Sequence, residues 1–188
     1  MPFTIDQIIQ AEQNLTVDQN DSYLVSYPEI INHFAGINHF SVHDLVICAH
    51  IVYGWMPTIL ELKGDGEYRA IAAEILHVAR DTGEIDITSL KLLKYVVNNS
   101  VVGPSKLLHF LRPDKFPIWD SRVCRFIFGV SHQNIMGNPE TYLEYMDNCG
   151  NVVNDARFDQ VSQSVNHKVG YPVTKIRAVE LIMYGSTD

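Results

Sequence analysis

The chain has 188 residues, of which 46% are hydrophobic and 19% charged, and its formal net charge at pH 7 is −8. A chain of this length and apolar content can bury a substantial core, which excludes a disordered or low-complexity protein. No apolar run approaches the roughly 20 residues of a membrane-spanning helix, and the first residues lack the basic and apolar regions of a secretory signal. We therefore expect a soluble, cytoplasmic protein that does not bind membranes.

The cysteines and histidines give little indication of a metal site. Three cysteines lie far apart, at Cys48, Cys124 and Cys149, so neither a disulfide framework nor a paired ligand spacing is predicted. A zinc site around His39, His43 and His50 is conceivable. However, no acidic residue lies between His39 and His43, as a His-Glu-x-x-His motif requires. We expect no metal and no cofactor.

Acidic overall charge argues against a nucleic-acid partner, because binding to phosphates needs lysines and arginines. The basic residues are nevertheless concentrated in one part of the sequence. Residues 86–125 contain three aspartates but seven basic residues, which are Lys91, Lys94, Lys106, Arg112, Lys115, Arg122 and Arg125. This cluster is consistent with a small basic footprint on a repelling surface, or with chance clustering on solvated helix faces.

Nearly every apolar pattern has helical spacing, and alternating strand-like runs are hard to find, which predicts an all-α protein. In chain order, we expect helices that begin after Thr4, at Pro28 and after Ser41, the last ending near Tyr53. Further helices are expected over residues 67–80, from Asp86 or Thr88 to about 97, over 105–111, from the Asp120 cap to Gly129, and over 139–149, 155–168 and 174–184. Loops are short, so we treat residues 1–188 as one compact domain, in which the termini can form a second small lobe.

The segment from about residue 98 to residue 129 carries the main functional hypothesis. Gly103-Pro104-Ser105-Lys106 follows a tight turn, and Trp119-Asp120-Ser121-Arg122-Val123-Cys124-Arg125 begins the next helix after a proline-containing loop. A turn that opens a helix presents free backbone N–H groups, which can hold a DNA phosphate. Asp120 would be fixed at the start of its helix.

This segment resembles the helix-hairpin-helix glycosylase superfamily, which includes endonuclease III and the 8-oxoguanine and 3-methyladenine DNA glycosylases. Asp120 matches the catalytic aspartate of the family, while Val123 and Arg125 match positions that follow it. Gly103 corresponds to a hairpin glycine and Lys106 to the lysine of bifunctional members. The sequence departs from the family pattern in having one hairpin glycine, a longer spacing from Gly103 to Lys106, and a Lys106–Asp120 separation about one helical turn shorter. It also lacks the iron–sulfur loop of endonuclease III.

The resemblance implies a DNA glycosylase, and it gives several residues expected roles. Asp120 would stabilise the oxocarbenium ion or activate water, with Lys106 as a second catalytic residue. The flipped-out base would stack in a pocket of aromatic and histidine side chains, with Trp119, Trp55, Tyr53 and His109 as candidates. DNA would be contacted by Gly103, Ser105, Lys91, Lys94, Arg122 and Arg125. The partner would be double-stranded DNA with a flipped base, or modified phage DNA, bound by a monomer.

Each of these residues also has a structural interpretation. Asp120 can be an ordinary N-cap, and Lys106 can be solvated or contact a phosphate rather than act as a nucleophile. Tyr53 and Trp55 can pack in a core. Two other functions therefore stay open: a non-catalytic helix-hairpin-helix module that binds DNA or protein, and an interaction protein that uses its acidic C-terminal helices.

Overall fold

The computed structural model describes residues 3–187, which form eleven α-helices, no strand, and one isolated β-bridge between Leu62 and Val97. The all-α prediction is confirmed. The helices are α1 (Ile5–Gln13), α2 (Ser22–Ala35), α3 (Val42–Trp55), α4 (Gly66–Thr82), α5 (Ile87–Val96), α6 (Val102–Leu111), α7 (Ser121–Phe128), α8 (Gln133–Met136), α9 (Pro139–Val153), α10 (Phe158–Val169) and α11 (Lys175–Gly185).

Most helix starts lie where side-chain caps predict them. Thr4 and Ser41 each form a capping box, and Asp86 accepts hydrogen bonds from the Thr88 and Ser89 amides. These bonds satisfy backbone donors that the first turn of a helix leaves without partners. At the other end, Gly83 and Gly129 terminate α4 and α7 in the left-handed conformation.

The predicted helix start at Pro28 is wrong, because α2 begins at Ser22 and contains Pro28 in its interior. Asp21 caps the helix by accepting a hydrogen bond from the Tyr23 amide. Proline cannot donate to the carbonyl four residues earlier, which belongs to Leu24. That carbonyl accepts a hydrogen bond of 2.8 Å from the Tyr171 hydroxyl instead, so a distant side chain replaces the missing bond.

Other boundaries also differ from the predictions, and α10 begins at Phe158 rather than at residue 155. α6 begins at Val102 rather than at Ser105, and α9 continues through Gly150 to Val153. The short α8 was not predicted, since its four residues are too few for a periodic pattern. The turn between α5 and α6 holds Asn98 and Asn99 with positive φ angles of 56° and 50°, a conformation that asparagine tolerates better than most residues.

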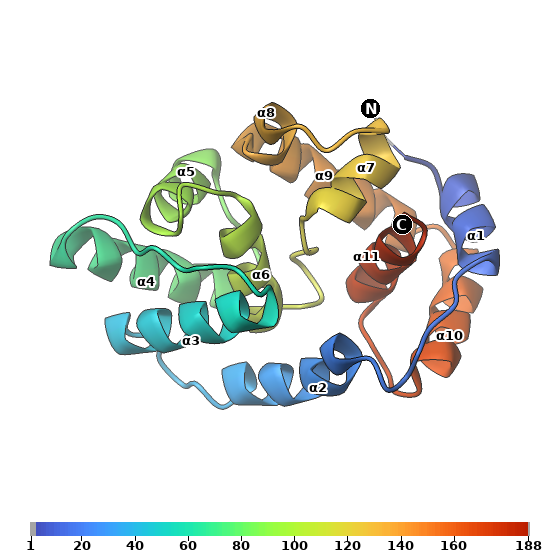
Figure 1. The fold of residues 1–188 in the computed structure, drawn as a ribbon, viewed down its shortest axis with the longest axis horizontal. Coiled ribbons are helices and arrows are strands. Elements are labelled where there is room, and N and C mark those ends of the chain that lie inside the picture. The colour runs from blue at the N-terminus through green and yellow to red at the C-terminus, as the bar shows by residue number, and fades with distance from the viewer. Residues whose placement is uncertain (1–2, 188) are drawn as a thin grey trace.

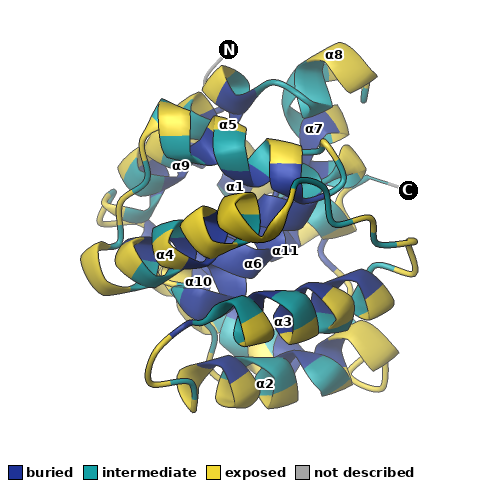
Figure 2. Ribbon diagram, turned by 90° about the vertical axis from the view of Figure 1, so that its left-hand side faces the viewer, coloured by how far each residue is buried: buried dark blue, intermediate teal, exposed yellow. Residues whose placement is uncertain are grey.

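The helices form two groups (Figure 1). α6 packs against α2, α3, α4 and α5, whereas α11 packs against α1, α7, α9 and α10, and contacts between α5 and α9 join the groups. Figure 2 shows α6 as a dark blue, buried helix behind the partly exposed α3 and α4. One hydrophobic cluster includes buried residues of both groups. Among the described helices, none is both long and apolar enough to cross a bilayer.

Candidate active site

The segment before Asp120 is held in place by buried side chains. Three of them donate to successive carbonyls: His109 Nδ1 to Phe116 at 2.7 Å, the Tyr142 hydroxyl to Pro117 at 3.0 Å and the Tyr145 hydroxyl to Ile118 at 3.2 Å. The amide of Trp119 donates to Ser105 Oγ at 3.1 Å, and its indole N–H donates to the Met136 carbonyl at 3.0 Å. These bonds come from α6, α9 and the end of α8, and they fix the position at which Asp120 emerges.

Asp120 caps α7, as predicted from the sequence. Its Oδ1 accepts hydrogen bonds of 3.0 Å from the amides of Arg122 and Val123. The side chain is only partly buried. The cap orients the carboxylate, and the exposed part of the Asp120 side chain borders a cavity. Asp120 therefore has both the structural role and the exposure that a catalytic carboxylate needs.

Lys106 lies on α6 and is 8% exposed. Its Nζ is 5.1 Å from the centre of the Trp55 ring, a cation–π distance. No ion pair of this lysine occurs among the described residues. Burial lowers the pKa of Lys106, against the opposing effect of the carboxylates of Asp120 and Glu180. The possibility that Lys106 is a solvated surface lysine is thus contradicted.

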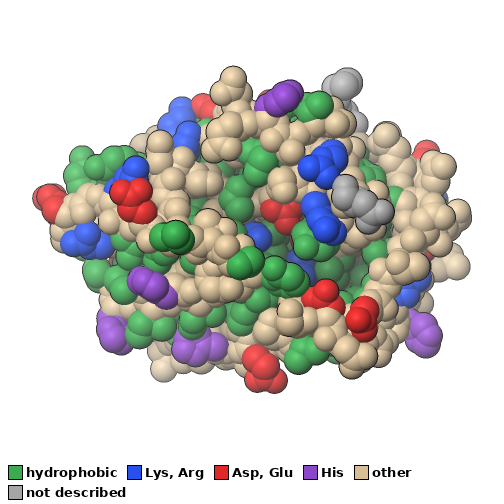
Figure 3. Space-filling model, in the orientation of Figure 1, with side chains coloured by type: hydrophobic (Ala, Val, Ile, Leu, Met, Phe, Trp, Pro, Cys, Tyr) green, Lys and Arg blue, Asp and Glu red, His purple; other side chains and the backbone are tan. Residues whose placement is uncertain are grey.

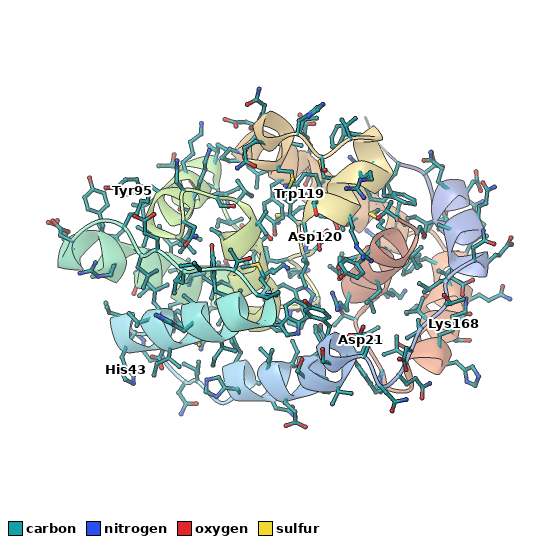
Figure 4. The ribbon with its side chains drawn as sticks, viewed as in Figure 1. Asp21, His43, Tyr95, Trp119, Asp120 and Lys168 are labelled. Atoms are coloured by element: carbon teal, nitrogen blue, oxygen red, sulfur yellow. The ribbon has the colours of Figure 1, made fainter. Side chains whose placement is uncertain are left out.

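Asp120 and Lys106 line the same cavity, which has a volume of about 500 Å³. Its walls come from the segment before α2, from the ends of α3 and α8, and from α6, α7 and α11. The charged residues that line it are Asp18, Asp21, Lys106, Asp120, Arg122, Arg177 and Glu180, and the aromatic ones are Tyr23, Trp55 and Tyr184. Figure 4 shows Asp120 between the two groups of helices, with Asp21 on the α2 side. In Figure 3, acidic and basic side chains meet near the middle of this face.

Two buried ionisable side chains on α11 border the cavity. Glu180 is 2% exposed and Arg177 is 3% exposed, and the Arg177 guanidinium donates a hydrogen bond to the Glu180 carboxyl. The guanidinium also lies over the ring of Tyr27, 4.5 Å from its centre. Burial raises the pKa of Glu180 to about 7, although Arg177 lowers it, and Asp120 raises it further.

The structure brings four of the predicted site residues to the cavity: Asp120, Lys106, Trp55 and Arg122. Five others lie in the interior, and they are Gly103, Ser105, Tyr53, Trp119 and His109. Ser105 positions Trp119, and His109 bonds to Tyr27 and Phe116. These residues support the site through packing and hydrogen bonds, and none of them lines the cavity.

The predicted DNA-contacting residues have separate environments. Lys91 forms an ion pair of 2.7 Å with Glu140, and Lys94 donates to the Gly137 carbonyl at 2.7 Å. Lys91 thereby ties α5 to the start of α9, and Lys94 ties α5 to the end of α8. Arg125 is exposed on α7. Arg122 is the one of these four that lines the cavity, where its guanidinium lies 4.6 Å from the centre of the Tyr184 ring.

Arg177, Glu180 and Tyr184 were missed by the sequence analysis. A signal was present, because Arg177 and Glu180 interrupt the apolar run of α11, in which almost every residue is buried. Charged residues are seldom fully buried unless they are paired. Their separation of three residues also allows pairing on one helix face. What the sequence does not show is that this face of α11 meets Asp120 and Lys106.

Two other features lie apart from this cavity. A cavity of about 450 Å³ between α4 and α5 is bordered by Glu74, Glu84 and Asp86, and none of the predicted site residues lines it. His39 contacts the ring of His77, with 4.6 Å between ring centres. Within residues 3–187, no three His, Cys, Asp or Glu side chains are grouped as metal ligands.

Comparisons with family models, with curated proteins and with solved structures find no match to this chain. The functional interpretation therefore depends on the geometry of the cavity and on the residues that border it.

Proposed function

We propose that this chain is a DNA N-glycosylase of the helix-hairpin-helix type, which hydrolyses the bond between a flipped-out base and its sugar. The observation that carries the proposal is the single cavity bordered by Asp120, Lys106 and Trp55. Its volume of about 500 Å³ lies within the range of roughly 300–1,000 Å³ that is usual for small-ligand sites. The order of α5, a tight turn, α6, an anchored loop and the Asp120 cap also supports a hairpin followed by a catalytic carboxylate.

Asp120 would act on the sugar. Loss of the base leaves positive charge at C1′, and a fixed carboxylate stabilises that charge and accepts a proton from the attacking water. The hydrogen bonds that hold residues 116–119 reduce the movement needed to place it. Lys106 borders the same cavity, where its amine can donate a hydrogen bond to the bound nucleotide. Water is the nucleophile in this proposal.

The test compares the wild type with Asp120→Asn on genomic DNAs that include modified phage genomes, with abasic sites counted by an aldehyde probe. We expect Asp120→Asn to lose about 10²–10³-fold in rate. Asparagine is also a good N-cap, so the fold should persist. Borohydride added to the same reactions should leave protein and DNA unlinked.

The control is Asp65→Asn. Asp65 caps α4 through the amides of Glu67 and Tyr68 at 3.0 and 3.1 Å, as Asp120 caps α7, but it does not line the cavity. Asp65→Asn should retain full activity. Equal activity of Asp120→Asn and Asp65→Asn would refute the catalytic role of Asp120.

The second candidate is a binding module without catalysis. It is favoured by the cap that Asp120 forms and by the protein contacts of Lys91 and Lys94. A module of this kind would bind DNA and leave every base in place. Intact DNA in all reactions, with wild type and Asp120→Asn binding equally, would establish it.

A further inference from the structure

The Glu180 carboxyl borders the cavity and has no role in the mechanism described above. It lies on α11, whereas Lys106 and Asp120 come from α6 and from the cap of α7. The Glu180 and Asp120 carboxyl groups thus border the same cavity as the Lys106 amine and the Arg177 guanidinium. Asp120 is partly exposed and accepts hydrogen bonds from two backbone amides. Glu180 is buried, which favours the neutral form.

Several titratable groups act on Glu180 from the surrounding helices. Arg177 is its hydrogen-bond partner, and Lys106 and Asp120 face it across the cavity. Further groups that interact electrostatically with Glu180 are Tyr27 from α2, Tyr145 and Cys149 from α9, and Tyr184 from α11. Burial raises the pKa of each of these four groups, so they are neutral near pH 7. The charges that matter there are those of Arg177, Lys106 and Asp120.

We propose that Glu180 is the general acid of the site and protonates the base as it departs. This inference rests on the glycosylase function proposed above. The C1′–N bond breaks and its electron pair stays on the base, while the carboxylic acid of Glu180 gives its proton to a ring nitrogen of that base. Water adds to C1′ and loses a proton to Asp120. The two carboxyl groups then return to their starting states by exchanging protons with solvent.

The pairing with Arg177 holds the Glu180 carboxyl in place without removing its ability to carry a proton. Because the pKa of Glu180 is about 7, both of its forms are populated at neutral pH, which is where general acids are most effective. Asp120 is held by two amides and is partly exposed, whereas Glu180 is buried beside Arg177. Two carboxyl groups in such different environments commonly divide the acid and base roles between them. Asp120 and Glu180 fit this division.

The experiment measures single-turnover rates of abasic-site formation from pH 5 to pH 9, on the DNA from which the wild type removes bases. Glu180→Gln keeps the size and the hydrogen-bonding oxygen but cannot act as an acid. We expect it to be at least about 10²-fold slower than the wild type at pH 6. The wild-type rate should fall as the pH rises through about 7, and Glu180→Gln should lack this fall. Glu144→Gln is the control, because Glu144 is an exposed carboxylate on α9.

A purely structural role for Glu180 gives a different result. Glu180→Gln would then change the melting temperature but keep the shape of the wild-type pH profile, which overturns the proposal. The wild-type profile is a second measurement that does not depend on the folding of any variant. If the wild-type rate does not fall between pH 6 and pH 8, Glu180 is not the acid.

The outcomes also separate this inference from the function on which it rests. If the wild type is active and Asp120→Asn is not, while Glu180→Gln behaves as the wild type, only the role of Glu180 is refuted. If the wild type removes no base from any DNA, both proposals fall.

Discussion

His109 lies within α6 with no exposed surface, and both of its ring nitrogens have partners. Because the Phe116 carbonyl can only accept, Nδ1 carries the proton, and Nε2 accepts a hydrogen bond of 2.8 Å from the Tyr27 hydroxyl. A neutral ring satisfies both bonds. His109 was expected in the base pocket, but it lies in the core. Its neighbours in the sequence do not show whether a histidine at this position contacts a ligand or the core.

Stability should depend on pH through this residue. Burial lowers the pKa of His109 from 6.5 to about 3 in the folded protein. The stability that its neutral form contributes is therefore present above about pH 6.5 and is lost as the pH falls towards 3. Between pH 7 and pH 5 the wild type should lose about 2 kcal/mol more free energy of unfolding than His109→Gln. Urea unfolding of both proteins at the two pH values measures these losses. Equal losses for the wild type and His109→Gln would contradict the prediction.

Among the elements, α6 departs most from what its sequence suggests. Its ten residues include a serine, a lysine and a histidine, yet nine of the ten are buried. Helical periodicity predicts one apolar face, but α6 is enclosed by α2, α3, α4 and α5. Ser105 anchors Trp119, His109 anchors Phe116, and Lys106 lines the cavity. Lys106 acquires its lowered pKa from this enclosure, and no local pattern shows it.

The packing of α6 on α3 should be sensitive to the size of residue 103. A Cβ at Gly103 would lie 2.8 Å from Tyr53 Cε2 and closer still to its hydroxyl. Gly103→Ala should therefore destabilise the protein by about 1–3 kcal/mol. The matched control is Gly150→Ala in α9, where a Cβ meets nothing within 4 Å. Alanine is the better helix former, so this change should stabilise by up to about 1 kcal/mol. Urea unfolding measures the change in the free energy of unfolding for both variants. Equal changes would contradict the close approach of Gly103 to Tyr53.

For the molecule as a whole, charge limits how it can bind DNA. The net charge of −8 repels the phosphate backbone, and the basic residues of the predicted footprint have different surroundings. Lys91 is paired with Glu140, whereas Arg122 is at the cavity and has no ion pair within the described part of the chain. A protein of this kind would bind bulk DNA weakly and would depend on few phosphate contacts.

Under the proposed glycosylase function, the salt dependence of DNA binding should reflect this arrangement. Arg122→Gln should lower the affinity and reduce the slope of log K against log salt concentration by about 1. Lys91→Gln should leave the slope nearly unchanged, because Lys91 is already neutralised by Glu140 at 2.7 Å. Fluorescence anisotropy over a salt series measures both. A larger effect of Lys91→Gln than of Arg122→Gln would place the DNA on the α5–α9 face instead.

The sequence by itself determined the all-α class, most helix starts and the position of Asp120 as the cap of α7. These features depend on residues three or four positions apart, and such interactions are local. It also placed Lys106 and Trp55 among the candidates. Only the tertiary structure decided that these residues share a cavity, that Gly103, Ser105 and His109 are buried, and that Glu180 and Arg177 from α11 line the same cavity. Burial and the pKa values that follow from it depend on contacts between residues far apart in the chain, which local patterns do not encode.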